Sequence, residues 1–157
     1  MTAMNFFTAA RRLVGSPFKL FPVSTRGKRP LIKGWPDQAS RDPVQLEHWA
    51  AQFPAANIGM VIPDGWIIVD LDRHGDSDGF ESLAFLEGEY DPLPMTPTVI
   101  TGGGGEHRYF RLPDGVKVKK SAGLVGSGID ILTDGAFVIG PGSIHESGIS
   151  YEWKPGH

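Results

Sequence analysis

Residues 66–72 read Trp-Ile-Ile-Val-Asp-Leu-Asp, an apolar run that ends in two carboxylates with one residue between them. Its Ile and Val residues favour a buried β-strand. Because alternate side chains of a strand face the same side, Asp70 and Asp72 should project together while Leu71 points into the core. Two acids held in this way repel each other unless a cation lies between them. Mg²⁺ and Mn²⁺ prefer carboxylate and water oxygens, so the stretch predicts a divalent-metal site, with solvated acids at a strand end as the alternative.

The composition is that of a single compact domain over residues 1–157, in a chain long enough to bury a core. Its 21 glycines and 13 prolines predict short elements and many turns. The lack of cysteine excludes a disulfide scaffold, a cysteine nucleophile and a thiolate zinc site, and is compatible with a reducing cytoplasm. The sequence has no signal-like start and no long apolar run, so we expect a cytoplasmic protein without a membrane span.

Charge is distributed unevenly along the chain, whose net charge is −3. Residues 1–35 carry seven Lys or Arg and no acid, whereas residues 36–100 carry twelve acids and two basic residues. Such asymmetry can place a basic face beside an acidic metal centre, as an enzyme that handles polyanions requires. A basic, solvated surface without a partner would give the same distribution.

Hydrophobic periodicity and capping residues predict helices and strands without regular β-α-β alternation. Asp42 followed by Pro43 is a strong helix start, and Asp78 can cap another helix with Glu81 as its capping-box partner. Asp134-Gly135 is typical of a hairpin turn and predicts that the strands on either side of it pair.

The predicted helices cover residues 5–14, 43–53 and 80–86, and the predicted strands cover residues 18–23, 57–62, 66–72, 98–101, 107–111, 128–132, 136–139 and 149–153. Residues 113–126 are expected to form a loop that carries lysines. This order favours an α+β fold with a largely antiparallel or mixed sheet.

A basic loop at residues 27–36 interleaves Lys28, Arg29 and Lys33 with Trp35. Positive and aromatic side chains in one loop suit contacts to phosphates and bases. The alternative is a loop held in place by a structural tryptophan.

Two further stretches can join the acids of residues 66–72. Four glycines at residues 102–105 let the backbone approach a ligand, and their N–H groups can form a nest for an anion, with His107 following on a strand. Asp130 lies in the apolar sequence Gly-Ile-Asp-Ile, where an unpaired charge would be costly and a shared metal would give it a partner. Carboxylates beside a phosphate-binding loop are what two-metal phosphoryl transfer requires.

These stretches resemble the three motifs of the archaeo-eukaryotic primase superfamily, and most closely those of primase–polymerase (prim-pol) domains from plasmids, phages and prophages. The motifs are Ile-Val-Asp-Leu-Asp at residues 68–72, Gly-Gly-Gly-Gly-Glu-His-Arg-Tyr-Phe at residues 102–110, and Gly-Ile-Asp-Ile at residues 128–131 followed by Pro-Gly-Ser-Ile-His at residues 141–145. The resemblance extends from about residue 18 to residue 153. It implies a prim-pol catalytic core with an RNA-recognition-like mixed or antiparallel sheet, packed against an N-terminal α/β unit.

The resemblance also implies residue roles. Asp70, Asp72 and Asp130 fall on the metal-binding acids, and His107 falls on the triphosphate-binding histidine; these four are the expected catalytic residues. Gly105 stands where the wider superfamily often has serine, which removes a hydroxyl contact and leaves the backbone N–H. The expected nucleotide-binding residues are Lys28, Lys33, Gly104, Gly105, His107, Ser143 and His145.

The activity implied by the resemblance is that of a DNA primase and DNA polymerase, which uses two Mg²⁺ or Mn²⁺ ions to join NTPs or dNTPs to a 3′-hydroxyl on single-stranded DNA template. The expected partners are the template, the primer and the nucleotide, with no membrane. Relatives commonly carry a primer-initiation or helicase region downstream. We therefore expect an isolated or minimal catalytic domain, or the N-terminal part of a longer replication protein, that extends a primer better than it starts one.

Three other function classes stay open from the sequence. Residues 70–81 nearly spell an EF-hand calcium loop, although His74 stands at the fifth position and a strand precedes the loop. A glycosyltransferase with an Asp-x-Asp motif and a nucleotide-sugar substrate would explain the first two acids but leave His107 and Asp130 without a role. A non-catalytic nucleic-acid-binding domain would not need three acids near one basic loop.

Overall fold

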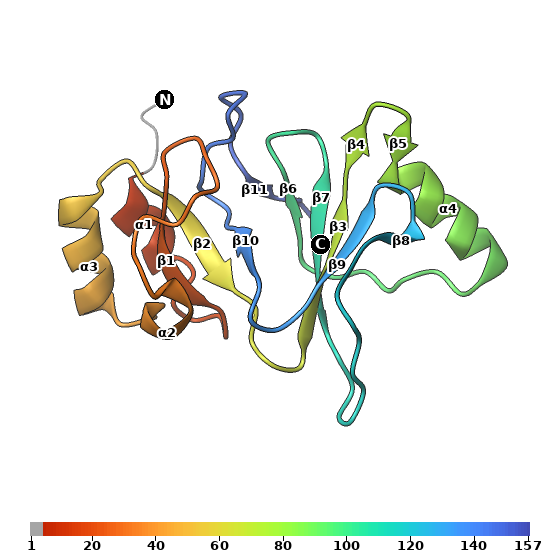
Figure 1. The fold of residues 1–157 in the computed structure, drawn as a ribbon, viewed down its shortest axis with the longest axis horizontal. Helices are drawn as coiled ribbons and strands as arrows, with labels where there is room; N and C mark the ends of the chain where they lie inside the picture. The colour runs from red at the N-terminus through yellow and green to blue at the C-terminus, as the bar shows by residue number, and fades with distance from the viewer. Residues whose placement is uncertain (1–4) are drawn as a thin grey trace.

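The computed structural model describes residues 5–157, which form two antiparallel sheets, a small hairpin and four helices (Figure 1). The helices are α1 (Phe6–Arg11), α2 (Trp35–Gln38), α3 (Pro43–Gln52) and α4 (Gly79–Glu89). The strands are β1 (Lys19–Val23), β2 (Asn57–Val61), β3 (Trp66–Leu71), β4 (Arg73–His74), β5 (Ser77–Asp78), β6 (Thr98–Ile100), β7 (Glu106–Arg111), β8 (Ser121–Gly126), β9 (Ile129–Leu132), β10 (Phe137–Ile139) and β11 (Glu152–Trp153).

One sheet has the strand order β1-β2-β10, and the other has the order β11-β6-β7-β3-β9-β8. The third pairing joins β4 to β5. Every strand pair among residues 5–157 is antiparallel, which confirms the α+β class and the antiparallel sheet expected from the sequence.

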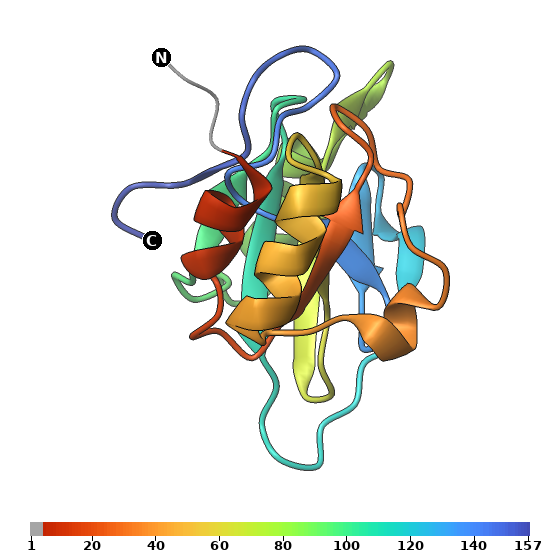
Figure 2. The same ribbon diagram turned by 90° about the vertical axis from the view of Figure 1, so that its left-hand side faces the viewer.

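The three-stranded sheet, α1 and α3 form the N-terminal unit, with both helices in front of the sheet in Figure 2. The α3 helix begins as predicted, because the Asp42 carboxylate accepts a hydrogen bond from the Val44 N–H at 3.0 Å. Leu46 and Trp49 are the buried side chains of α3. No helix within residues 5–157 combines the length and the apolar character needed to cross a membrane.

Two apolar clusters lie on opposite faces of the six-stranded sheet, as the alternation along β3 predicts. Ile68 and Tyr109 belong to the cluster shared with the N-terminal unit. Leu71 belongs to the second cluster with Leu83 of α4, which covers the other face. Because Asp70 and Ile68 are two residues apart in a strand, Asp70 faces the N-terminal unit.

The predicted hairpin across Asp134-Gly135 is wrong. The β9 strand pairs with β3 and β8, whereas β10 pairs with β2 in the other sheet. The turn therefore carries the chain from one sheet to the other. Phe137 of β10 packs edge-on against Phe21 and Trp35, so burial of aromatic surface outweighs the local hairpin preference.

Two segments outside the predicted helices and strands contain short strands. Residues 73–78 form the β4–β5 hairpin, and residues 121–126 form β8 at the edge of the large sheet. The β8 sequence, Ser-Ala-Gly-Leu-Val-Gly, has little β propensity, and its pairing with β9 is irregular between Ala122 and Gly126. Its pairing satisfies backbone N–H and C=O groups of β9 that would otherwise lie at an open edge of the sheet. Hydrophobic periodicity in the sequence does not indicate such pairing.

Trp35 of the basic loop lies half-buried at the start of α2. Its ring stacks on Phe21 with centroids 4.9 Å apart and meets Phe137 edge-on, also at 4.9 Å. The structure therefore favours the structural alternative for this tryptophan over a contact to a base.

Candidate metal centre

Three neighbouring strands place three polar side chains in one row. The β3 strand lies between β7 and β9, and Asp70 of β3 pairs with His107 on one side and Asp130 on the other. Directly paired residues of antiparallel strands share a face of the sheet. The register therefore aligns Asp130, Asp70 and His107, although their strands are far apart in the sequence.

Asp72 lies directly after β3 and is held through its backbone. Its N–H donates to the Gly128 carbonyl at 2.9 Å, and its carbonyl accepts from the Gly79 N–H at 2.8 Å. A Cβ on Gly79 would lie 2.3 Å from the Gly128 carbonyl oxygen and 3.1 Å from the Asp72 nitrogen. The backbone clamp that positions Asp72 thus leaves no room for a side chain at Gly79.

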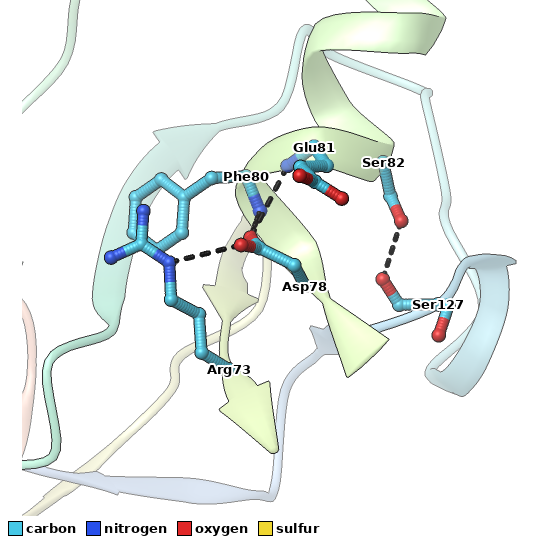
Figure 3. A network of polar contacts seen from close by, with 6 residues as sticks. All are labelled: Arg73, Asp78, Phe80, Glu81, Ser82 and Ser127. Atoms are coloured by element: carbon cyan, nitrogen blue, oxygen red, sulfur yellow. Dashed lines mark hydrogen bonds and ion pairs between the residues drawn. The ribbon is translucent and has the colours of Figure 1, made fainter. Parts of the chain in front are cut away.

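A polar network supports the same junction (Figure 3). The Asp78 carboxylate accepts from the first free N–H groups of α4, as predicted, and pairs with Arg73 at 3.2 Å. The Ser82 hydroxyl donates to the Ser127 carbonyl at 2.5 Å. Together these contacts tie the β4–β5 hairpin, α4 and the turn before β9 to one another. Residues 73–78 pair as a hairpin, and this pairing replaces the open calcium-binding loop that the EF-hand alternative requires.

Carboxylate oxygens of Asp70, Asp72 and Asp130 lie within 4.8 Å of one another. Among residues 5–157, three buried side-chain nitrogen or oxygen atoms have no hydrogen-bond partner, and they are Asp70 Oδ1, His107 Nδ1 and Tyr109 Oη. Buried polar atoms are normally satisfied, so this orphaned group indicates a ligand at the site. Three half-buried carboxylates form an all-oxygen set, which fits Mg²⁺ or Mn²⁺.

The protonation of Asp70 reflects this crowding. Burial and the charges of Asp72 and Asp130 raise the pKa of Asp70 to about 7, with Lys28 acting weakly in the opposite direction. A bound divalent cation favours the ionised form of a carboxylate. The three acids therefore repel one another in the protein alone, and a cation would relieve the repulsion.

His107 is buried on β7, with its Nε2 3.6 Å from Asp70 Oδ1. Burial, with a smaller effect of the Lys28 charge, lowers the pKa of His107 to about 4. The imidazole is therefore neutral at pH 7, and its contact with Asp70 is not an ion pair. Its one N–H can be donated to a carboxylate or a phosphate oxygen. Arg108 lies on the opposite face and pairs with Glu106 at 2.9 Å.

A cavity of about 200 Å³ opens beside this row, between the large sheet and the N-terminal unit. Its polar lining consists of Lys28, Asp70, Asp72, His74, Thr101, Gly103, His107, His145 and Tyr151. A second cavity of about 340 Å³ shares Lys28, His145 and Tyr151 with the first. Acids, histidines and one lysine therefore face a common space.

The two lysines expected to bind nucleotide lie in different surroundings. Lys28 lines both cavities, and its charge affects the pKa values of Asp70 and His107. Lys33 is exposed and does not line either cavity. The structure brings Lys28, and not Lys33, to the row of acids.

The glycine turn uses its N–H groups within the turn. The Gly104 N–H donates to the Thr101 carbonyl at 3.1 Å, and the Gly105 N–H donates to Thr101 Oγ1 at 3.0 Å. Both expected phosphate donors are thus engaged, while Gly103 lines the cavity. A Cβ on Gly105 would lie 2.3 Å from the Leu71 carbonyl oxygen, so a serine there would not fit without a shift of the turn.

His145 approaches the glycine turn from the loop before β11. The Ser147 N–H donates to His145 Nδ1 at 3.1 Å, and the Ser147 hydroxyl oxygen lies 3.0 Å from the same atom, so both contacts use Nδ1 and neither uses Nε2. That nitrogen faces Gly103, where an added Cβ would lie 3.4 Å from it. Ser143, by contrast, is buried outside the cavity lining, and its hydroxyl accepts from the Ile58 N–H at 2.9 Å. This hydrogen bond is a structural contact, and the structure does not bring Ser143 to the cavity lining.

Sequence reasoning missed three polar residues of the cavity lining, which are His74, Thr101 and Tyr151. Thr101 directly precedes the glycines, which is a local signal that could have found it. Tyr151 follows the Pro-Gly-Ser-Ile-His stretch in the last predicted strand, and only the fold brings it to the same cavity as the acids. Burial and the charges of Asp70 and Asp72 raise the pKa of Tyr151 to about 12.

The chain matches the N-terminal domain of bifunctional DNA primase/polymerase (Prim-Pol) over residues 10–157, and it belongs to this family. The match confirms the resemblance drawn from the motifs. It places the protein among primase/polymerase-type nucleotidyltransferases, which act on nucleotides and nucleic acid. No curated protein matches the chain.

Proposed function

We propose that this protein is a metal-dependent DNA primase and DNA polymerase that joins NTPs or dNTPs to a 3′-hydroxyl on a single-stranded DNA template. The observation that carries the proposal is the row of Asp130, Asp70 and His107 with Asp72 beside it, next to a cavity that Lys28 lines. Membership of the Prim-Pol family supports the same class of reaction.

The protein's contribution to the reaction is to hold the acids in place. Asp70, Asp72 and Asp130 are the residues that would bind two Mg²⁺ or Mn²⁺ ions. The chemistry supplied when they are bound is activation of the attacking hydroxyl and neutralisation of the triphosphate. Strand pairing fixes Asp70 and Asp130, and the backbone clamp fixes Asp72, so little reorganisation is needed during the reaction. Attack by the 3′-hydroxyl oxygen on the α-phosphorus forms the new P–O bond and releases pyrophosphate.

The triphosphate would lie among donors on the far side of the cavity. Lys28 offers a positive charge, His145 turns its Nε2 towards the glycine turn, and Gly103 contributes backbone close to that imidazole. An ammonium group suits phosphate as a point charge, and a neutral N–H adds direction. Neutral His107 can donate to Asp70 or to a phosphate oxygen without adding charge.

The experiment that tests this function is a gel assay on single-stranded template, with and without an annealed primer, using NTPs or dNTPs with Mg²⁺ or Mn²⁺. We expect primer extension, with Mn²⁺ at least as effective as Mg²⁺. Extension should exceed primer synthesis, because ordering two nucleotides and a template costs more entropy than ordering a duplex end and one nucleotide. Asp130→Asn should keep the fold and lose at least about a hundredfold in rate.

Two results would contradict the proposal. One is full activity of Asp130→Asn, which would remove the acid row from the chemistry. The other is no nucleotide incorporation under any condition together with calorimetric binding of a nucleotide-sugar, which would favour the glycosyltransferase alternative.

A further inference from the structure

An exposed basic arm leaves the large sheet at the end opposite the β4–β5 hairpin. The arm comprises residues 113–120, Pro-Asp-Gly-Val-Lys-Val-Lys-Lys, between β7 and the edge strand β8. All its residues are exposed. It projects beyond the body of the molecule at the bottom of both Figure 1 and Figure 2. The proposed function as stated above gives this arm no role.

The arm carries positive charge that the rest of the structure does not neutralise. Lys117, Lys119 and Lys120 are accompanied by a single acid, Asp114. Within residues 5–157, none of the close contacts between a basic and an acidic side chain includes any of the three lysines. Solvated surfaces usually intersperse charges of both signs, so an unneutralised basic arm on a protein of net charge −3 is complementary to a polyanion.

Apolar side chains are exposed beside these lysines. Val116 and Val118 alternate with the lysines in the arm, and Leu124 on β8 is 84% exposed. A nucleic-acid strand presents anionic phosphates together with the apolar faces of sugars and bases. Lysines interleaved with apolar side chains match that combination better than a purely charged loop would.

The register of β8 places the arm beside the metal-bearing face. Ala122 of β8 pairs with Asp130, and Ser121 pairs with Ile131. Lys120 is the residue directly before Ser121, the first paired residue of β8. The arm therefore ends two residues before Ala122, the β8 residue that lies opposite Asp130.

The length of the chain before Ala122 limits the distance from the acids. Lys117 lies five positions before Ala122, the partner of Asp130. Residues 117–120 lie outside the strand, and at about 3.3 Å per residue an extended chain carries Lys117 at most roughly 17 Å from Ala122. That distance corresponds to about five nucleotides at 3.4 Å each.

We propose that the arm and the adjoining edge of β8 bind the sugar–phosphate backbone of the primer–template duplex about five nucleotides from the metal centre. The inference rests on the proposed polymerase function. It assigns to that function a second nucleic-acid contact, separate from the nucleotide cavity. It also sets a minimum duplex length below which the arm cannot contribute.

The test compares the variant Lys117→Gln/Lys119→Gln/Lys120→Gln with a control, Arg11→Gln/Arg12→Gln/Lys19→Gln. Both lose three exposed positive charges, but the control residues lie in the N-terminal unit. Fluorescence anisotropy would measure the binding of cross-linked primer–templates with about three or about twelve base pairs, without metal and over a range of salt concentrations. Primer extension by the unsubstituted protein in the same buffer reports on the proposed function separately.

We expect the arm variant to bind the long duplex at least about tenfold more weakly. The slope of log affinity against log salt concentration should be smaller by about two to three, because binding releases about one counterion fewer for each phosphate contact that is lost. The arm variant's affinity for the short duplex, and both affinities of the control, should match those of the unsubstituted protein. Unchanged affinity of the arm variant for the long duplex would refute the proposal that the arm binds DNA, and it is the result expected if the arm binds a protein partner. Normal primer extension in the same experiment would leave the proposed polymerase function intact. Equal losses on both duplexes would also refute the proposed arm contact. No DNA binding by the unsubstituted protein would overturn both proposals.

Discussion

Asp70 is the residue at which the demands of the site and of folding conflict. Its pKa is about 7 in the folded protein, against an ordinary value of 3.8, because it is buried beside Asp72 and Asp130. Between these two values the folded protein binds more protons than the unfolded chain, so the free energy of unfolding falls as the pH rises. The cost of ionising Asp70 is absent below the lower value and complete above the higher one.

We therefore expect Asp70→Asn to stabilise the metal-free protein. At about pH 8 the substitution removes a cost of at most about 4 kcal/mol, which corresponds to several degrees in Tm, and the gain should shrink towards pH 5. Scanning calorimetry in the presence of a chelator would measure it, with Asp114→Asn on the exposed arm as the control. An unchanged or lower Tm for Asp70→Asn at pH 8 would show that the acids do not repel one another as described.

Gly79 offers a second test at this scale, because it touches no substrate and acts only through Asp72. An added Cβ would push against the Gly128 carbonyl and the Asp72 nitrogen. Gly79→Ala should therefore weaken Mn²⁺ binding by about tenfold while circular dichroism shows a folded protein. Gly88→Ala, in the same helix but with nothing within 4 Å of the added Cβ, should bind Mn²⁺ normally and gain up to about 1 kcal/mol of stability. Equal Mn²⁺ affinity in the two variants would remove Gly79 from the positioning of Asp72.

Elements defined by local signals were predicted well, and those defined by distant partners were not. The caps Asp42 and Asp78 lie next to the helices they start, so the sequence contains the whole interaction. The sheet that β10 joins depends on the packing of Phe137 against residues more than a hundred positions earlier in the sequence. The edge strand β8 forms only because β9 is present beside it.

The same distinction applies to the site. Asp70 and Asp72 could be joined from their spacing on one strand, and Asp130 from its position in an apolar strand. The structural hydrogen bond of Ser143 could not be predicted, because the Ile58 N–H that donates to its hydroxyl is far away in the sequence. Tyr151 was not among the expected site residues, since it lines the same cavity as the acids only in the folded chain.

Lys28 and Lys33, both in the loop between β1 and α2, are expected to differ in their effect on nucleotide binding. Lys28→Gln should weaken NTP or dNTP binding by about tenfold and flatten its salt dependence, because this ammonium group faces the cavity. Lys33→Gln should leave nucleotide affinity nearly unchanged, since the residue is exposed and outside both cavities. Calorimetric titration with a nucleotide would measure both variants. Equal effects would mean that the loop acts through its overall charge and not through Lys28.

At the scale of the whole molecule, a net charge of −3 conceals two basic surfaces on either side of an acidic centre. Lys28 lies on the N-terminal unit, and the arm of residues 113–120 leaves the far edge of the large sheet. The acids lie where the two sheets meet. This arrangement suits a substrate that brings phosphates past bound cations, and it makes the metal centre the feature on which the rest depends.

The most direct test of that centre is to count bound Mn²⁺ by electron paramagnetic resonance at about pH 8, with and without a non-hydrolysable dNTP analogue. With the analogue, the unsubstituted protein should bind two Mn²⁺ ions per chain, as a two-metal site requires. Asp130→Asn should remain folded and bind fewer ions, with weaker affinity for those that remain. Two Mn²⁺ ions bound with unchanged affinity by Asp130→Asn would contradict the assignment of Asp70, Asp72 and Asp130 as the metal centre.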